Sequence, residues 1–374
     1  MARDRAPRTW IDVSAALTQR AGIARYVRGL TEAMVKLAPG TLGTYSHSWT
    51  TPGVPPFGVP HAGSPHSARH WRMGLMAGHL LHRTVLPGLD QFDRFLATDL
   101  AFPFGSKDQM VVTVHDLTPV THPGTHAPLT RFYSRFMLNQ LKRRQHRIIA
   151  VSHQTARDLA THAGIDPRLI TVIHPGVAEA FHAIPDASQV RETLNRYGLK
   201  LPFALTVGTL EPRKNLRRLI GAFERVAKPG ETLVVVGGKG WGGEAGLGDQ
   251  YRASDRTRVI GFVPDDDLSC LYRACQVFVM PSLHEGFGSP IAEALACNAT
   301  VICSTQCGAI ELAVSKVTLV DPLQEGVIAH ALRQHLDQTE GRPLDTPHKV
   351  RTYSDAALQM LEALQQISKV HSER

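Results

Sequence analysis

Short apolar runs alternate with helical patterns along most of this chain. The runs that predict strands occupy residues 11–13, 110–114, 148–152, 169–173, 203–207, 233–236, 259–263 and 277–280. Apolar positions at helical spacing follow several of them. Nearly unbroken apolar strands that alternate with helices are typical of parallel sheets covered on both faces. The pattern therefore predicts an α/β fold.

The length predicts more than one domain, because 374 residues exceed what a single hydrophobic core usually supports. We place a first domain at residues 1–176, which ends just after the strand at 169–173. A second domain is predicted at residues 177–350, and a terminal helix with one apolar face at residues 351–374.

Residues 41–75 are rich in Pro, Gly, His and Ser, a composition that predicts a long loop. His61, His66 and His70 lie in this stretch without a fixed spacing, so we predict no metal site there.

The stretch at residues 281–294 joins an apolar strand to a helical run, with Gly286 and Gly288 in the connecting loop. Ligands of open α/β sheets bind at the carboxyl ends of the strands, where helix N-termini offer N–H groups to phosphates. Glu285 and Glu293 place one carboxylate before the helix and one inside it. Such a pair can hold hydroxyls at two ends of an extended ligand, for example a nucleotide sugar. The alternative is an ordinary turn with two solvated glutamates.

Arg213 and Lys214 follow the strand at 203–207 and precede a helical pattern. The helix dipole disfavours cations at this end, so two of them indicate a bound anion. Arg213 can bind a diphosphate through two N–H groups, and Lys214 can act as a point charge. A solvated basic cap is the alternative.

Two strands of the first domain are followed by further candidates. Gly22 and Arg25 open the helical pattern after the first strand, and His115 ends the strand at 110–114. Side chains at such positions reach the ligand-binding edge of a parallel sheet. A structural histidine and a surface arginine are the alternatives, and the adjacent His115 and Asp116 cannot form a metal site alone.

The string P-S-x-x-E-G-F-G-x-P-x-x-E-A around Glu285 and Glu293 resembles the signature of retaining glycosyltransferases of the GT-B type. The family is the large glycogen-synthase and sucrose-synthase-like one, family 4 or glycosyl transferases group 1. The resemblance implies two Rossmann-like domains that face a cleft, with the donor on the second domain, the acceptor on the first and the terminal helix crossing back. This chain has Asn298 where relatives carry glycine, and asparagine can adopt the same left-handed backbone.

The resemblance also implies roles for individual residues. Catalysis would involve Glu285, His115, Arg213 and Lys214. Donor contacts would come from Gly22, Gly208, Arg213, Lys214, Phe262, Val263, Glu285, Gly286, Phe287, Gly288 and Glu293. Acceptor contacts would come from Arg25, Asp116 and Ser152. No metal or other cofactor is implied, and we interpret the acidic run at residues 265–267 as helix caps.

The G-I-A-R-Y string at residues 22–26, His115-Asp116, Gly240-Trp241 and the E-G-F-G box together resemble bacterial mannosyltransferases of O-antigen and capsule assembly. This resemblance implies transfer of mannose from GDP-mannose to a glycan or a lipid-diphosphate-linked oligosaccharide, with retention of configuration. A UDP-sugar-dependent transferase, a nucleotide-sugar 2-epimerase and an inactive binding subunit are the alternatives.

The net charge of +8 predicts an anionic partner. Nucleic acid is not expected, because no recognition motif accompanies the charge. A basic amphipathic helix at residues 130–147 can lie on an anionic bilayer or pack on the sheet, and we favour packing. The sequence shows neither a secretory segment nor an apolar run of membrane-spanning length. We therefore expect a cytoplasmic protein, with peripheral contact to the inner membrane surface as a further expectation.

The five cysteines all lie between residues 270 and 307 and form no C-x-x-C pair. This pattern supports neither a disulfide framework nor a zinc site, so buried reduced thiols are predicted.

Overall fold

A computed structural model describes residues 8–19, 22–49, 55–84, 93–106, 109–238, 256–312, 317–338 and 350–372. The chain forms two compact units, residues 1–176 together with 351–374 (unit 1), and residues 177–350 (unit 2). Within the described part of the chain, every helix is either too short or too polar to cross a lipid bilayer.

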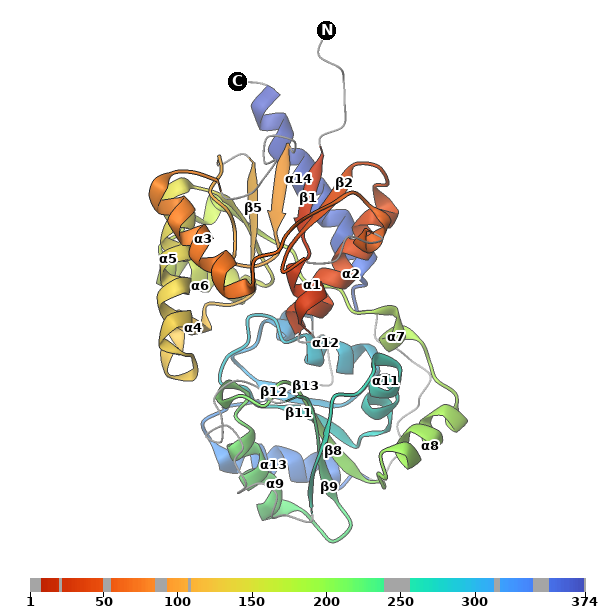
Figure 1. Ribbon diagram of the computed structural model, residues 1–374. Helices are drawn as coiled ribbons and strands as arrows, with labels where there is room; N and C mark the ends of the chain where they lie inside the picture. The colour runs from red at the N-terminus through yellow and green to blue at the C-terminus, as the bar shows by residue number, and fades with distance from the viewer. Residues whose placement is uncertain are drawn as a thin grey trace. The chain divides into compact units, whose positions relative to one another are not determined.

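Unit 1 contains a parallel seven-stranded sheet with the strand order β3-β2-β1-β4-β5-β6-β7. The strands β1, β2 and β5 are labelled in Figure 1. Its strands are β1 Thr9–Asp12, β2 Leu42–His47, β3 His61–Ser64, β4 Arg94–Ala97, β5 Met110–Val114, β6 Arg147–Ala150 and β7 Ile170–Val172. Its helices are α1 Ser14–Thr18, α2 Gly22–Leu37, α3 Ala68–Leu81, α4 Thr118–Thr121, α5 Pro128–Arg144, α6 His153–Ala163 and α14 Tyr353–Ser372, with 3-10 turns η1 Pro56–Gly58, η3 Pro123–Thr125 and η4 Pro167–Leu169. The helix α14 packs on α2, where the Tyr353 ring leaves no room for a side chain at Gly29.

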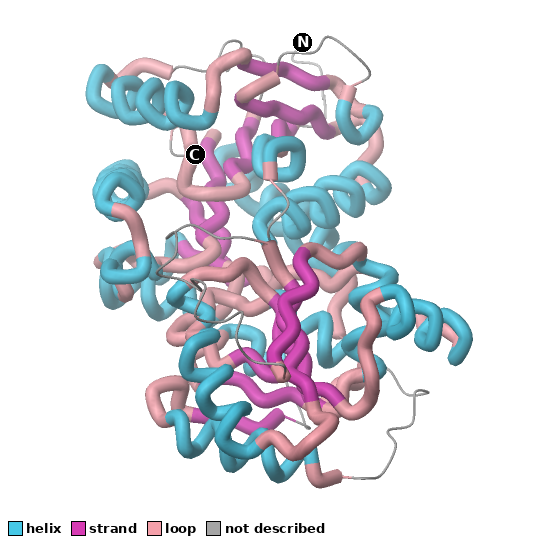
Figure 2. The backbone as a smooth tube through the Cα atoms, turned by 60° about the horizontal axis from the view of Figure 1, so that its bottom comes forward, coloured by secondary structure: helices cyan, strands magenta, loops and turns pink. Residues whose placement is uncertain are grey.

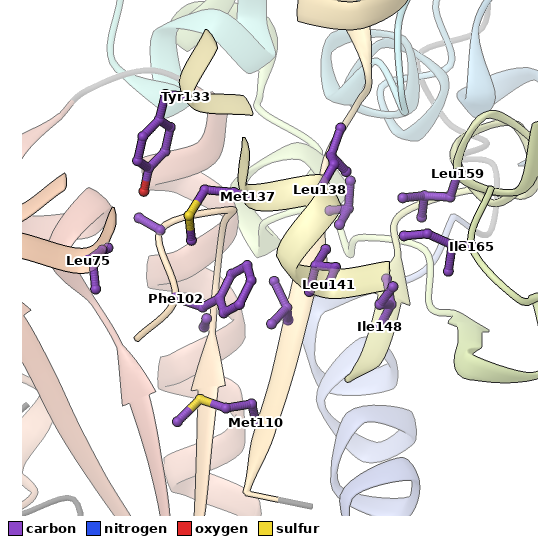
Figure 3. Close-up of a cluster of buried hydrophobic side chains, with 14 of the residues drawn as sticks. Leu75, Phe102, Met110, Tyr133, Met137, Leu138, Leu141, Ile148, Leu159 and Ile165 are labelled. Carbon is purple, nitrogen blue, oxygen red and sulfur yellow. The ribbon is translucent and has the colours of Figure 1, made fainter. Parts of the chain in front are cut away.

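A hydrophobic core cluster of unit 1 lies where α3, α5 and α6 cover the sheet (Figure 3). Every residue of β5 is buried, as expected for a strand covered on both faces. On α5 the apolar side, with Met137, Leu138 and Leu141, is buried against the sheet. The expectation that this basic helix packs on the sheet is thus confirmed for its apolar face.

The expected loop at residues 41–75 is wrong for most of that range, because β2, β3 and the start of α3 lie there. The strand β2 buries polar side chains, and a polar segment is predicted from its composition to be a loop. Thr44 Oγ1 and Ser46 Oγ bond the two ring nitrogens of His61 in β3, over 3.0 and 3.2 Å. These hydrogen bonds offset the cost of burying polar side chains, so a polar strand can lie inside the sheet. The polar composition therefore gave a wrong prediction of loop for this segment.

Unit 2 contains a parallel six-stranded sheet with the strand order β10-β9-β8-β11-β12-β13. Five of these strands are labelled by name in Figure 1, and strands are drawn in magenta in Figure 2. Its strands are β8 Phe203–Val207, β9 Thr232–Val236, β10 Thr257–Gly261, β11 Val277–Met280, β12 Val301–Ser304 and β13 Val317–Val320. Its helices are α7 Glu179–His182, α8 Ala187–Arg196, α9 Leu216–Val226, α11 Asp265–Ala274, α12 Ser289–Ala296 and α13 Glu325–Leu336, with 3-10 turns η5 Pro212–Lys214 and η7 Gly308–Leu312.

Two sequence predictions for unit 2 can be compared directly with its structure. All five cysteines are free and buried, as predicted. Asp265, Asp266 and Asp267 occupy the first turn of α11, while the cap position belongs to Pro264. The aspartates therefore favour the helix through its dipole rather than as the predicted caps.

The carboxyl ends of β8, β9 and β10 are joined by backbone hydrogen bonds. Gly208 N–H donates to the Val236 carbonyl over 2.9 Å, and Gly237 N–H donates to the Gly261 carbonyl over 2.8 Å. Gly237 has a φ of 154°, and a side chain there would overlap the carbonyl oxygen of Gly208. Only glycine fits this close approach of two loops.

We predict that Gly237→Ala lowers the free energy of unfolding by at least about 2 kcal/mol, because backbone atoms must move to admit the methyl group. The neighbouring Gly238→Ala is the matched control, since its methyl group would meet no atom within 4 Å. Urea unfolding of both variants checks the prediction. Equal stability of the two variants would contradict it.

Candidate active site

The loop between β11 and α12 carries Glu285 and is held by the segment that follows β12. Glu285 N–H donates to the Gln306 carbonyl over 2.9 Å, and Gly308 N–H donates to the Glu285 carbonyl over 3.3 Å. Gly288 has a φ of 91°, and a Cβ there would lie 2.6 Å from the Cys307 sulfur. The backbone of the fold therefore sets the position of Glu285.

Arg213 and Lys214 lie in η5, the 3-10 turn between β8 and α9. Asn215, with a φ of 58°, separates them from α9, so they precede this helix, as the sequence predicted. The Asn215 amide donates to the carbonyls of Pro281 and Pro322, over 3.0 and 2.7 Å. This side chain ties the cationic turn to the loop that carries Glu285.

The structure brings Glu285 into contact with both cations, which lie about 70 residues earlier in the chain. Lys214 Nζ is 2.7 Å from Glu285 Oε1, and Arg213 Nη1 is 2.6 Å from Glu285 Oε2. Arg213 Nη1 also donates to the His284 carbonyl over 2.9 Å. A Cβ on Gly208 would lie 3.0 Å from Lys214 Cε, so glycine leaves room for the lysine stem.

The ion pairs determine the protonation state of Glu285. Burial alone would raise the pKa of this carboxyl, but Arg213 and Lys214 outweigh burial and lower its pKa to about 2. Glu285 is therefore ionised at neutral pH. It can accept hydrogen bonds from hydroxyl groups and cannot serve as a general acid.

Glu293 lies on α12 and is almost fully buried. Its Oε2 accepts a hydrogen bond from the Tyr272 hydroxyl over 3.1 Å. In the described structure the carboxylate thus has a partner inside unit 2, and its predicted contact with a ribose stays a prediction.

The other predicted donor contacts differ in exposure. Phe262 follows β10 and is 54% exposed, whereas Val263 is buried beside it. Gly286 and Phe287 are buried in the β11–α12 loop, next to Glu285. An exposed aromatic ring can stack on a nucleobase, while the buried residues support the loops.

In unit 1, His115 lies at the carboxyl end of β5. Its Nε2 bonds the Thr98 carbonyl over 2.8 Å, and its ring meets the Tyr26 ring edge-on with centroids 4.9 Å apart. A carbonyl only accepts, so Nε2 carries the proton and Nδ1 is the acceptor atom. Burial lowers the pKa of His115 despite nearby Asp99 and Asp116, so the ring is neutral at pH 7.

Asp12 is a candidate functional residue that the sequence analysis did not single out. It is buried at the end of β1, and its Oδ1 accepts from Ser14 N and Oγ over 2.9 and 2.5 Å. Burial, and then the charge of Asp99, raise the pKa of Asp12 to about 7. An acidic residue inside the apolar run at 11–13 was the available signal, since buried carboxylates with raised pKa cluster at functional sites.

Two predicted acceptor residues have structural partners. Asp116 Oδ1 accepts from Thr118 N and Oγ1, over 2.8 and 2.6 Å. Ser152 is fully buried and caps α6, because its Oγ accepts from Thr155 N over 2.9 Å. Their roles toward an acceptor stay predictions.

The remaining candidates lie on α2 or outside the described residues. Gly22 is the first residue of α2 and is exposed, and Arg25 lies nearly one turn later and is half-buried. Gly240 and Trp241 lie outside the described residues.

Comparison with known families covers both units. The family described as "Glycosyltransferase Family 4" matches residues 20–181, and the family described as "Glycosyl transferases group 1" matches residues 192–354.

Curated relatives share part of the sequence. The O-antigen chain mannosyltransferase B of Escherichia coli is 36% identical over 151 residues, which are 38% of this chain and 39% of the relative. The serotype-specific mannosyltransferase WbdA of Escherichia coli is 32% identical over 203 residues, which are 51% of this chain and 25% of the relative. This chain thus matches well under half the length of each.

A solved structure shares the fold over nearly the full chain. The Anabaena protein HepE, in complex with UDP and glucose, superposes with a TM-score of 0.73 at 16% identity, covering 96% of this chain and 99% of HepE. Both sheets of this chain are parallel and Rossmann-like, and both units match consecutive glycosyltransferase families. The chain therefore belongs to the glycosyltransferases of family 4 and group 1, with the GT-B fold.

Proposed function

We propose that this protein transfers mannose from GDP-mannose, with retention of configuration, to a glycan or lipid-diphosphate-linked oligosaccharide in bacterial O-antigen or capsule synthesis. The observation that carries the proposal is the buried cluster of Arg213, Lys214 and Glu285. Two mannosyltransferases among its relatives, one of them an O-antigen chain mannosyltransferase, support the choice of sugar.

In the proposed mechanism the two cations of η5 bind the donor diphosphate. The glycosidic bond breaks with positive charge developing on the sugar and negative charge on the leaving diphosphate. Arg213 and Lys214 stabilise the leaving group, and they do so most strongly as its charge grows. Glu285, ionised at neutral pH, accepts hydrogen bonds from the sugar hydroxyls, and Glu293 is proposed to bind the ribose.

In unit 1 we propose that His115 contacts the substrate as a neutral ring. Its Nε2 is engaged by the Thr98 carbonyl, so Nδ1 is the atom that can accept a hydrogen bond from a sugar hydroxyl. Gly22 and Arg25 on α2, with Asp116 and Ser152, complete the proposed substrate contacts of this unit.

The proposal requires no metal ion, because two cations already supply positive charge beside the diphosphate. The second candidate donor is a UDP-sugar, favoured by the structural relative HepE, which was solved with UDP and glucose. Incubation with donor alone distinguishes a nucleotide-sugar 2-epimerase from a transferase. The epimerase would convert the sugar of the donor although no acceptor is present.

We further propose that the enzyme works in the cytoplasm, at the inner membrane surface, and contacts it through α3 and α5. Unit 1 contains 23 Lys and Arg against 13 Asp and Glu, a charge of +10, whereas unit 2 contains 18 against 20, a charge of −2. Residues 117–157 contain no acidic side chain. The positive charge therefore does not serve the donor unit and suits an anionic surface.

Exposed apolar side chains accompany this charge. Five large ones lie on α3 and α5, which contact each other: Met73, Leu80, Leu81, Leu129 and Phe132. Exposed cations flank them, namely Arg69, Arg72, Arg135, Lys142 and Arg143. Apolar groups within a basic surface fit the interface of an anionic bilayer.

Lys214→Ala should lower kcat/KM by about 100-fold or more, because a charge that stabilises the leaving diphosphate is lost. Glu285→Gln should do the same by weakening the contacts with the sugar. The matched controls are Lys228→Ala and Glu325→Gln, which alter more exposed ion pairs of unit 2. Mannosyl transfer measured for all four variants checks this, and near-normal turnover of the first two would refute the site.

GDP should raise the Tm more than UDP or ADP do, by about 5 °C at a concentration 100-fold above its Kd, because ligand binding stabilises the native state. The shift should persist in EDTA. Scanning fluorimetry with each nucleotide checks both statements. A Tm shift with UDP alone would replace GDP by UDP as the proposed donor nucleotide. Loss of the Tm shift in EDTA would contradict metal-free binding.

Wild-type protein should co-sediment with vesicles rich in phosphatidylglycerol, and Lys142→Glu with Arg143→Glu should weaken binding by at least about tenfold, since each basic residue near the surface contributes about 1 kcal/mol. Lys200→Glu with Arg217→Glu is the matched control, because both residues are exposed in unit 2. Equal binding of the two double variants would contradict the α3 and α5 surface.

A further inference from the structure

Glu211 holds the guanidinium group that is proposed to grip the diphosphate. Arg213 Nη2 lies 2.5 Å from Glu211 Oε1, and the two side chains are only 13% and 11% exposed. Arg213 Nη1 bonds Glu285 and the His284 carbonyl on the other side. The guanidinium is therefore held at both terminal nitrogens by carboxylates, and Glu211 contributes one of them.

The cluster carries no net charge before a ligand arrives. Arg213 and Lys214 supply two positive charges, and Glu211 and Glu285 supply two negative ones. A diphosphate that enters this cluster meets two cations whose positive charge is already balanced by the two carboxylates. Each carboxylate so close to Arg213 lowers the affinity of the site for phosphate oxygens.

The two carboxylates are not equivalent under the proposed function. Glu285 accepts hydrogen bonds from the sugar, so its repulsion of the diphosphate is compensated while the donor is intact. Glu211 lies on the β8–η5 loop next to Arg213 and has no proposed contact with the sugar. Its charge acts on the diphosphate alone, and the product is a nucleoside diphosphate that has lost the sugar contacts.

We propose that Glu211 is a positioning residue that orients Arg213 and keeps the nucleoside diphosphate product weakly bound, so that it leaves after transfer. The inference rests on the proposed function, because it requires a diphosphate at Arg213 and Lys214. It assigns to Glu211 a role opposite in sign to that of Lys214: one carboxylate weakens binding of the anion that the lysine strengthens.

The test compares Glu211→Gln with wild-type protein by calorimetric titration of GDP and UDP. Glutamine keeps the length and a hydrogen-bond acceptor for Arg213 but removes the charge. The Kd of the nucleoside diphosphate should fall by about tenfold, as expected for removing one partly screened charge a few ångströms from an anion. In turnover, the inhibition constant of the product should fall in parallel, and kcat should fall more than kcat/KM.

Two further variants keep the test decisive. Glu224→Gln is the matched control, because it removes the same charge from the exposed side of α9 and should leave the Kd unchanged. Glu211→Ala removes the charge together with the support of Arg213, and it should still bind GDP more tightly than wild type does. Glu211→Ala replaces the glutamine variant in the test if Glu211→Gln folds poorly.

The outcomes separate this inference from the proposed function. Wild-type protein that binds no nucleoside diphosphate would overturn the proposed function and this inference with it. If wild-type protein binds GDP or UDP and both Glu211 variants have an unchanged or higher Kd, this inference alone is overturned. Tightening in Glu224→Gln equal to that in Glu211→Gln would also overturn it, because a general charge effect would then suffice.

Discussion

Glu285 is a buried carboxylate held between Arg213 and Lys214, and much of unit 2 is arranged to make this contact possible. Desolvating three charges costs free energy that their attraction only partly returns, so apolar residues would stabilise this region more. We therefore attribute the arrangement to the proposed binding of a charged ligand, since folding stability alone does not favour it. Buried ions that are already oriented need little reorganisation when a charged substrate replaces part of the network.

The contact depends on loops at one edge of a parallel sheet. The strands β8, β9 and β11 deliver their connecting loops to that edge, and backbone hydrogen bonds join these loops to one another. Glycines at 208, 237 and 288 permit the close approaches that the loops require. Rigid placement of this kind keeps charged side chains in position without a bound ligand.

Charge is distributed unequally between the two units. Unit 2, which carries the cations proposed to bind the diphosphate, is slightly acidic overall, whereas unit 1 carries the basic excess. Net charge therefore says little about the proposed donor site, where four nearby ionic groups balance one another. The positive charge lies on unit 1, beside exposed apolar groups of α3 and α5, where we propose that it serves a separate anionic partner.

The sequence by itself determined the features that depend on local spacing. The unbroken apolar runs predicted strands in both sheets, but not β2, β3, β4, β12 and β13. The E-G-F-G box and the Arg213-Lys214 pair identified the family, and the left-handed backbone predicted for Asn298 is confirmed by its φ of 59°. Only the tertiary structure decided which groups meet. Glu285 pairs with Lys214 across 71 residues, because parallel strands joined by crossovers bring distant loops to one edge. For the same reason the buried polar strand β2 and the raised pKa of Asp12 depend on neighbours that lie far away in the chain.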